Sequence, residues 1–165
     1  MTIVVDVDVV DPAWLAAGEV GSLAQDVVAA TLTEVGKRVH PDAEVSVRLC
    51  DDDEIRALNL AWRNTDKATN VLSFPAPGGN RGPLLGDIVV AIPYVAIEAR
   101  AAGRSLRDHL AHMLAHGTLH LLGFDHENEN DAEEMESLER RILAKLGIND
   151  PYSDSVPVES ASISI

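Results

Sequence analysis

Cysteine is nearly absent from this sequence, since the 165 residues include only Cys50. A single thiol excludes a framework of internal disulfides, and a chain of this length buries enough apolar surface to fold without cross-links. Scarce cysteine is also typical of proteins in a reducing compartment. Cys50 ends an alternating segment, 45–50, so we interpret it as a small buried side chain and not as a catalytic thiol.

Long hydrophobic runs are missing as well. No run approaches the roughly 18 apolar residues that a membrane-spanning helix needs. The first residues, 1–6, have neither the basic start nor the long apolar stretch of a secretory signal. We therefore expect a cytoplasmic protein that does not insert into a membrane.

Basic residues are outnumbered, because 13 Lys and Arg face 27 Asp and Glu and the net charge is −14. This balance argues against indiscriminate binding of nucleic acid, since phosphates are repelled by a uniformly acidic surface. The charges are uneven, however: seven of the basic residues lie within 56–107, whereas 127–139 contains seven acidic residues and no basic one. The field near the functional site, and not the net charge, therefore decides whether the protein binds nucleic acid.

What the chain does contain is a series of strand and helix patterns. Alternating or β-branched segments predict strands over 3–10, 44–50, 70–74 and 86–92. Helices are predicted over 13–38, 52–63, 93–103, 105–121 and 132–146. Gly18 and Gly21 are points at which the first helix can be interrupted. The patterns indicate an α+β fold, a small mixed four-stranded sheet packed with about five helices, with one domain over 1–152 and a flexible tail over 153–165.

Five of the six histidines lie between residues 109 and 126. His116 and His120 are four residues apart on a predicted helix, so both rings project from one face within reach of a single ion. Gly123 allows the chain to turn sharply, so that His126 can return and supply a third ligand. The spacing suits zinc, and we predict one Zn²⁺ per chain, bound by these three residues at the end of the histidine-bearing helix.

Two further histidines, His109 and His112, precede this group on the same stripe of the helix. A rival ligand set of His112, His116 and His120 would extend over about 12 Å at 1.5 Å per residue, too far for one tetrahedral ion. We interpret His109 as a core or surface histidine. For His112 an ordinary position, a contact with a metal ligand and a contact with substrate all stay open.

Three imidazoles leave at least one coordination position free. A structural zinc site is normally closed by four protein ligands, whereas an open site lowers the pKa of bound water and makes hydroxide available. The pattern therefore indicates a hydrolytic metal centre. The same histidine spacing occurs in metzincin peptidases, but Gly117 stands where they have a glutamate base, which argues against a peptidase of that type.

The stretch HGTLHLLGFDH, residues 116–126, closely resembles the HGxLHLxGxDH signature of the YbeY family of endoribonucleases. Other segments resemble further family motifs in the same order, and the resemblance covers about residues 44–152. These segments are Leu58–Asn59, Trp62–Arg63, 69–75, 86–88, 133–135 and 150–152.

The resemblance implies a zinc-dependent, single-strand-specific endoribonuclease that matures the 3′ end of small-subunit ribosomal RNA and takes part in ribosome quality control. Its partners would be single-stranded or precursor ribosomal RNA and the ribosome, while the oligomeric state is left open. The metal ligands carry over to His116, His120 and His126, and the functional arginine to Arg63. We assign catalytic roles to Arg63, as a clamp on the phosphate, and to Asp125, as a base or a residue that orients a histidine.

Each assignment has an alternative. Arg63 is otherwise a surface residue in a salt bridge, and Asp125 a turn residue with a local backbone hydrogen bond. Asn70 and Ser73 are candidates for the lining of the cleft, although Asn70 could equally satisfy backbone groups at a strand start. Two other functions compete at this point: a metallohydrolase acting on peptides or amides, and a non-catalytic ribosome-assembly factor that contains zinc.

Overall fold

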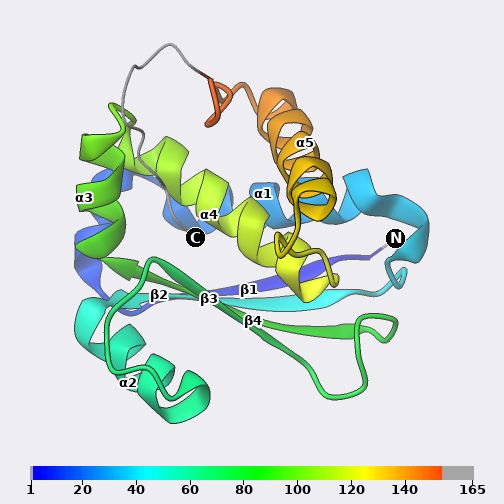
Figure 1. Cartoon of the computed structure of the whole chain (residues 1–165), viewed down its shortest axis with the longest axis horizontal. Helices are drawn as coiled ribbons and strands as arrows, with labels where there is room; N and C mark the ends of the chain where they lie inside the picture. Colours follow the sequence, from blue (N-terminus) through cyan, green and yellow to red (C-terminus); the bar gives the residue numbers. More distant parts are fainter. Residues whose placement is uncertain (1, 154–165) are drawn as a thin grey trace.

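A mixed four-stranded sheet forms the base of the part of the chain that the computed structural model describes, residues 2–153 (Figure 1). Its order is β1-β2-β4-β3. Strands β1, β2 and β4 run parallel to one another, and β3 pairs antiparallel with β4 at the edge. The strands are β1 (Val4–Val9), β2 (Glu44–Asp51), β3 (Val71–Pro75) and β4 (Leu84–Ile92).

Five α-helices and two short 3₁₀ segments complete this part of the chain. The α-helices are α1 (Val20–Val35), α2 (Asp52–Arg63), α3 (Tyr94–Ala101), α4 (Leu106–Leu121) and α5 (Glu129–Lys145). The 3₁₀ segments are η1 (Pro12–Ala17) and η2 (Gly36–Arg38). The predicted α+β fold is confirmed. Apart from Ser153, the predicted flexible tail lies outside the described residues.

The helix starts follow local capping signals. The Asp51 side chain accepts a hydrogen bond from the Glu54 amide at 2.9 Å, and the Ser105 hydroxyl accepts one from the Asp108 amide at 3.0 Å. Both are ordinary N-caps. The predicted single helix over 13–38 is wrong in its first turns, because the chain breaks at Gly18, whereas Gly21 lies inside α1.

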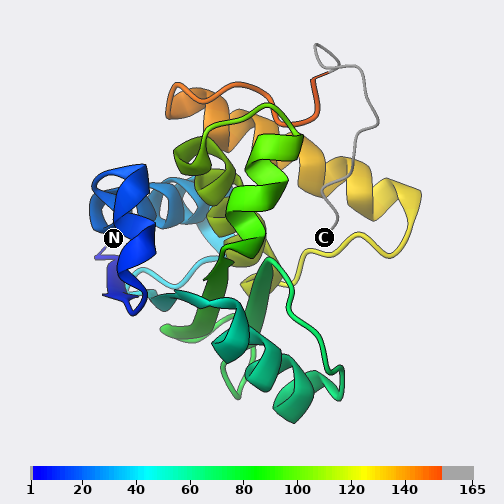
Figure 2. The ribbon, with the colours of Figure 1, turned by 90° about the vertical axis from the view of Figure 1, so that its left-hand side faces the viewer.

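The sheet separates two apolar layers. Figure 2 shows α2 on one side of the sheet and α1, α3, α4 and α5 on the other. Along β4, Ile88 and Val90 belong to the large core on the four-helix side, and Val89 and Ala91 to the smaller cluster under α2. The second half of β4 is therefore buried on both faces. Cys50 is fully buried in the smaller cluster, as predicted.

Helix α4 runs through the middle of the four-helix layer, packed against α1, α3, α5 and the sheet (Figures 1 and 2). Every residue from 109 to 119 is buried. A helix buried on all sides has no solvated face for its polar side chains, so they need partners inside the protein. The histidines of α4 are therefore held by other elements, and its C-terminal end lies beside the edge strand β3.

Candidate metal centre

Three histidines gather at the C-terminal end of α4. His116 and His120 lie one turn apart on the helix, and their Nε2 atoms are 3.0 Å apart. Gly123 then adopts φ 97°, a conformation that side chains disfavour, and the turn brings His126 back toward the helix. One nitrogen from each ring lies within 4.8 Å of the other two. The predicted ligands are thus brought together, with His116 buried, His120 half-buried and His126 exposed.

The donor set suits a transition-metal ion. Tetrahedral zinc with bonds of about 2.0–2.1 Å separates its nitrogen ligands by about 3.4 Å, a spacing within the range that the three rings span. Burial, followed by the neighbouring rings of His116 and His126, lowers the pKa of His120 to about 4. His120 is therefore neutral at pH 7, and its lone pair is available to a metal without a proton having to leave first.

A buried carboxylate supports the ligands from behind. Glu139 of α5 is completely buried, and its Oε2 lies 2.7 Å from Nδ1 of His116. Its other oxygen, Oε1, lies 2.7 Å from Nε2 of His112 and accepts a hydrogen bond from the Tyr152 hydroxyl. Burial alone would raise the pKa of Glu139, but the hydrogen bonds from His112 and His116 hold it below its ordinary value.

This carboxylate selects the tautomer of His116. A carboxylate only accepts hydrogen bonds, so Nδ1 of His116 carries the hydrogen and Nε2 keeps its lone pair toward the cluster. Burial, followed by the charge of Glu139, raises the pKa of Tyr152, which therefore remains a neutral donor. Histidine ligands are commonly oriented in this way by a carboxylate on the far ring nitrogen.

The two upstream histidines are buried and do not join the cluster. His112 contacts Glu139, and Glu139 in turn contacts His116. Of the three roles left open for His112, the structure is nearest to the contact with a predicted metal ligand, made through this carboxylate. His109 is a core histidine, and its Nε2 lies 3.0 Å from Oε1 of Glu98. Asn70 donates to the same Glu98 and accepts from the Val71 amide at 2.7 Å, which is the backbone role foreseen for a strand start.

Arg63 forms the opposite wall of the site. It is the last residue of α2, and its Nη2 donates to the Ser73 carbonyl at 2.6 Å. No salt bridge among residues 2–153 includes Arg63, so the surface ion pair that was its alternative is not observed there. A cleft of about 270 Å³ joins Arg63 to the cluster. It is lined by Arg63, Val71, Leu72, Ser73, Pro75, His116, His120 and His126.

The sequence matches one family over most of its length. The model of the family Endoribonuclease YbeY matches residues 14–147. The chain belongs to this family. It is 47% identical over 152 residues to Endoribonuclease YbeY of Methylocella silvestris, covering 92% of this chain and 86% of that protein. It is 49% identical to Endoribonuclease YbeY of Azorhizobium caulinodans, again over 152 residues, covering 90% of this chain and 96% of that one.

The fold of this YbeY family member also resembles a solved structure. The solution structure of TM1509 from Thermotoga maritima superposes with a TM-score of 0.55 at 23% sequence identity, covering 96% of this chain and all of that one. At this identity the likeness shows a shared fold. No helix in the described part of the chain is long and apolar enough to cross a membrane.

The glycine inside the family signature has a steric cause here. A Cβ on Gly117 would lie 2.9 Å from Cγ2 of Ile88 and 3.1 Å from Oγ of Ser73, which itself donates to the Gly117 carbonyl. Position 117 therefore faces the sheet and not the metal ligands. A glutamate base of the metzincin kind has no room at this position.

The aspartate of the YbeY signature makes a local contact. The Asp125 carboxylate accepts a hydrogen bond from the Glu127 amide at 3.1 Å, the turn contact that was its alternative. It lines a separate pocket of about 150 Å³ together with Arg38 and Asp131. Its catalytic assignment stays a prediction.

Glu139 was missed at the level of sequence because it ends the acidic segment 127–139. One signal does distinguish it from its neighbours: it stands within the apolar stripe of α5. The buried residues of that stripe are Met135, Leu138, Glu139, Ile142 and Leu143. An acidic residue on the buried face of an amphipathic helix needs a partner in the core.

Proposed function

We propose that this protein is a zinc-dependent endoribonuclease that cuts single-stranded segments of ribosomal RNA precursors at the 3′ end of small-subunit RNA. In this proposal it acts in the cytoplasm, binds the ribosome and takes part in ribosome quality control. The reaction class, hydrolysis of phosphodiester bonds within RNA during rRNA processing, comes from membership of the YbeY family. One observation carries the assignment to this site: an arginine that has no carboxylate partner in the described part of the chain faces a three-histidine cluster across a single cleft.

The three histidines would hold the ion. When bound, zinc supplies a Lewis acid for a phosphoryl oxygen and lowers the pKa of a coordinated water. The protein contributes the orientation of the ligands. Glu139 fixes the proton of His116 on Nδ1, and Tyr152 and His112 fix Glu139 in turn. His126 is the exposed member of the cluster, so substrate would enter on its side.

Arg63 binds the phosphate. Within residues 2–153, its guanidinium contacts the Ser73 carbonyl and the Phe74 ring, both uncharged, and forms no ion pair, so turning toward an anion breaks none there. A phosphodiester offers two oxygens that match the planar fork of arginine, and the contact strengthens as charge gathers in the transition state. Arg63 is also the one arginine or lysine among the residues that line the cleft, so it supplies a positive charge beside the histidines.

Hydrolysis of peptides or amides is not favoured. Position 117 has no room for a glutamate base. A peptide substrate would also need free backbone groups along the outer edge of β3. The Ala91 amide donates to the Asn70 carbonyl, and the Ala76 amide donates to the Leu85 carbonyl. Even-numbered residues of this segment therefore point their backbone groups toward β4, and odd-numbered residues point theirs away, so the Ser73 carbonyl faces outward. That carbonyl already accepts a hydrogen bond from Arg63.

A purely structural zinc site is not favoured either. Such sites are closed by a fourth protein ligand. Within residues 2–153, the group that can hold an ion contains three histidines and no further cysteine, aspartate or glutamate. An ion held by these three histidines would keep a coordination position for water or substrate.

The assignment is tested by offering the purified protein two substrates, a single-stranded RNA that extends past the mature 3′ end and casein. We expect cleavage of the RNA alone, its loss with a chelator, and its return with added zinc. Cleavage of casein but not of RNA would overturn the proposal. The Asp125→Asn variant distinguishes a base from a turn residue. If Asp125 is the base, the variant should retain zinc and cleave RNA about 100-fold more slowly. If Asp125 only holds the turn, the variant should lose stability and keep its cleavage rate.

A further inference from the structure

One tryptophan of this chain is exposed next to the cleft. Trp62, in the last turn of α2, has 71% of its surface exposed, the largest fraction of any exposed large apolar residue in the described part of the chain. The other tryptophan, Trp14, is fully buried and donates from Nε1 to the Cys50 carbonyl at 3.0 Å. Tryptophan side chains are usually buried, and Trp62 is not, so packing of the core does not explain a tryptophan at this position.

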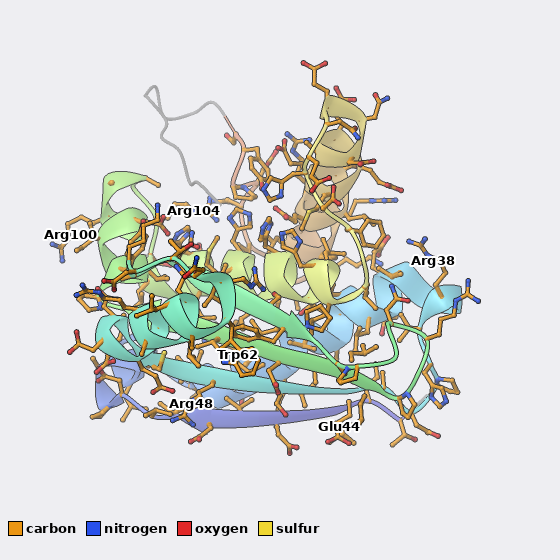
Figure 3. The ribbon with its side chains drawn as sticks, turned by 60° about the horizontal axis from the view of Figure 1, so that its bottom comes forward. Arg38, Glu44, Arg48, Trp62, Arg100 and Arg104 are labelled. Atoms are coloured by element: carbon orange, nitrogen blue, oxygen red, sulfur yellow. The ribbon has the colours of Figure 1, made fainter. Side chains whose placement is uncertain are left out.

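Trp62 connects to the cleft through two neighbours. Its ring centre lies 6.5 Å from that of Phe74 in an edge-to-face arrangement, and the Arg63 guanidinium lies 5.3 Å from the same Phe74 ring. The indole is therefore no more than about 12 Å from the guanidinium. We call Trp62 and Phe74 the aromatic shelf. Figure 3 shows Trp62 beside α2, over the strands of the sheet.

We propose that the aromatic shelf stacks an unpaired RNA base, from a nucleotide next to the phosphate that Arg63 holds. This inference rests on the proposed function. Proteins that bind single strands combine a cation for the backbone with aromatic faces for the bases, and every base offers such a face. A base inside a duplex has none to spare, because both of its faces are already stacked. The shelf thereby selects single-stranded substrate and reads no sequence.

The surroundings of Trp62 favour a base over a protein partner. Exposed apolar patches that mark protein interfaces are contiguous and cover several hundred square ångströms. Within α2 the other exposed large apolar residue is Leu60, and Arg56 of the same helix forms an exposed ion pair with Asp66, which follows the helix. One indole that continues into a cleft with a cation matches a nucleotide, with its flat base and its charged phosphate.

The test measures binding of a short single-stranded RNA by zinc-free protein in chelator, so that no cleavage interferes. Trp62→Ala and Trp62→Leu should weaken the Kd about tenfold, and Trp62→Phe should restore most of the affinity. Leu60→Ala, which removes an exposed apolar side chain from the same helix, should change the Kd little. Full affinity in Trp62→Leu would overturn the proposal, because leucine keeps apolar area but has no aromatic face.

A second arm identifies the base. An RNA with one abasic nucleotide beside the cleavage position should bind the wild type about tenfold more weakly, while Trp62→Ala should not distinguish it from intact RNA. Equal losses in both proteins at every abasic position would overturn the stacking contact. The two proposals fail separately: wild-type protein that neither binds nor cuts RNA contradicts the function, whereas efficient cleavage with an unchanged Kd in Trp62→Ala contradicts the shelf alone.

Discussion

Replacing Glu139 with glutamine should weaken zinc binding without unfolding the site. Glutamine has the shape of glutamate but offers one oxygen and one NH₂ group. The Oε1 position accepts from both His112 and Tyr152, so the amide oxygen is best placed there. The NH₂ group then faces Nδ1 of His116, which must become an acceptor. Its proton moves to Nε2, the nitrogen that would bind the metal.

The expected loss is that of a partner to a metal ligand, about 10- to 100-fold in affinity, or about 1.4–2.7 kcal/mol. A chromophoric chelator competing for zinc measures it. Glu98→Gln is the matched control, because Glu98 also accepts from a buried histidine, His109, but within residues 2–153 has no hydrogen bond to the three clustered histidines. It should lower the free energy of unfolding by about 1–3 kcal/mol and leave the zinc affinity unchanged.

Two results would refute this reasoning. Unchanged zinc affinity in Glu139→Gln would mean that the carboxylate does not select the tautomer of His116. Equal losses of affinity in Glu139→Gln and Glu98→Gln would mean that both act through general loosening of α4. Comparing the unfolding of the two zinc-free variants in urea separates stability from affinity.

Three further predictions follow from the same geometry. Arg63→Ala should fold, hold its zinc and cleave RNA about 100-fold more slowly, since it loses a charged contact made in the transition state; zinc loss, or near-normal cleavage, would contradict the clamp. The metal-free protein should lose stability to urea as the pH falls from 6.5 toward 4, because the unfolded chain protonates His120 while the folded chain, with a pKa of about 4, does not; an equal decline in His120→Ala would assign the loss elsewhere. Gly117→Ala should destabilise the protein by about 1 kcal/mol, because overpacking against Ile88 outweighs the better helix propensity of alanine; a gain in stability would show that the sheet yields.

Local signals in the sequence predict much of this structure. The histidine cluster follows from helical spacing and one sharp turn, so bringing His116, His120 and His126 together could be predicted without knowledge of the rest of the fold. The caps at Asp51 and Ser105 are equally local. Each depends on residues close together in the chain, where backbone geometry alone restricts the outcome.

The contacts that were not foreseen join distant segments. Glu139 meets His116 only because α5 packs across α4, and Arg63 meets Ser73 only because α2 covers the far face of the sheet. Parallel pairing of β2 with β4 likewise needs a long crossover connection, and the sequences of the two strands do not predict its register. Packing between elements decides such contacts, and the residues concerned otherwise look like ordinary surface charges.

The central claim is that one ion on three histidines drives RNA cleavage, and titration of zinc tests it most directly. Cleavage of single-stranded RNA is measured as zinc is added to metal-free protein, for the wild type, His120→Ala and His109→Ala. The wild-type rate should rise up to one equivalent per chain and then stay constant. His109→Ala should follow it in zinc stoichiometry, and His120→Ala should bind no zinc and show no cleavage. Full cleavage by metal-free protein, or a zinc-loaded and active His120→Ala variant, would contradict the account.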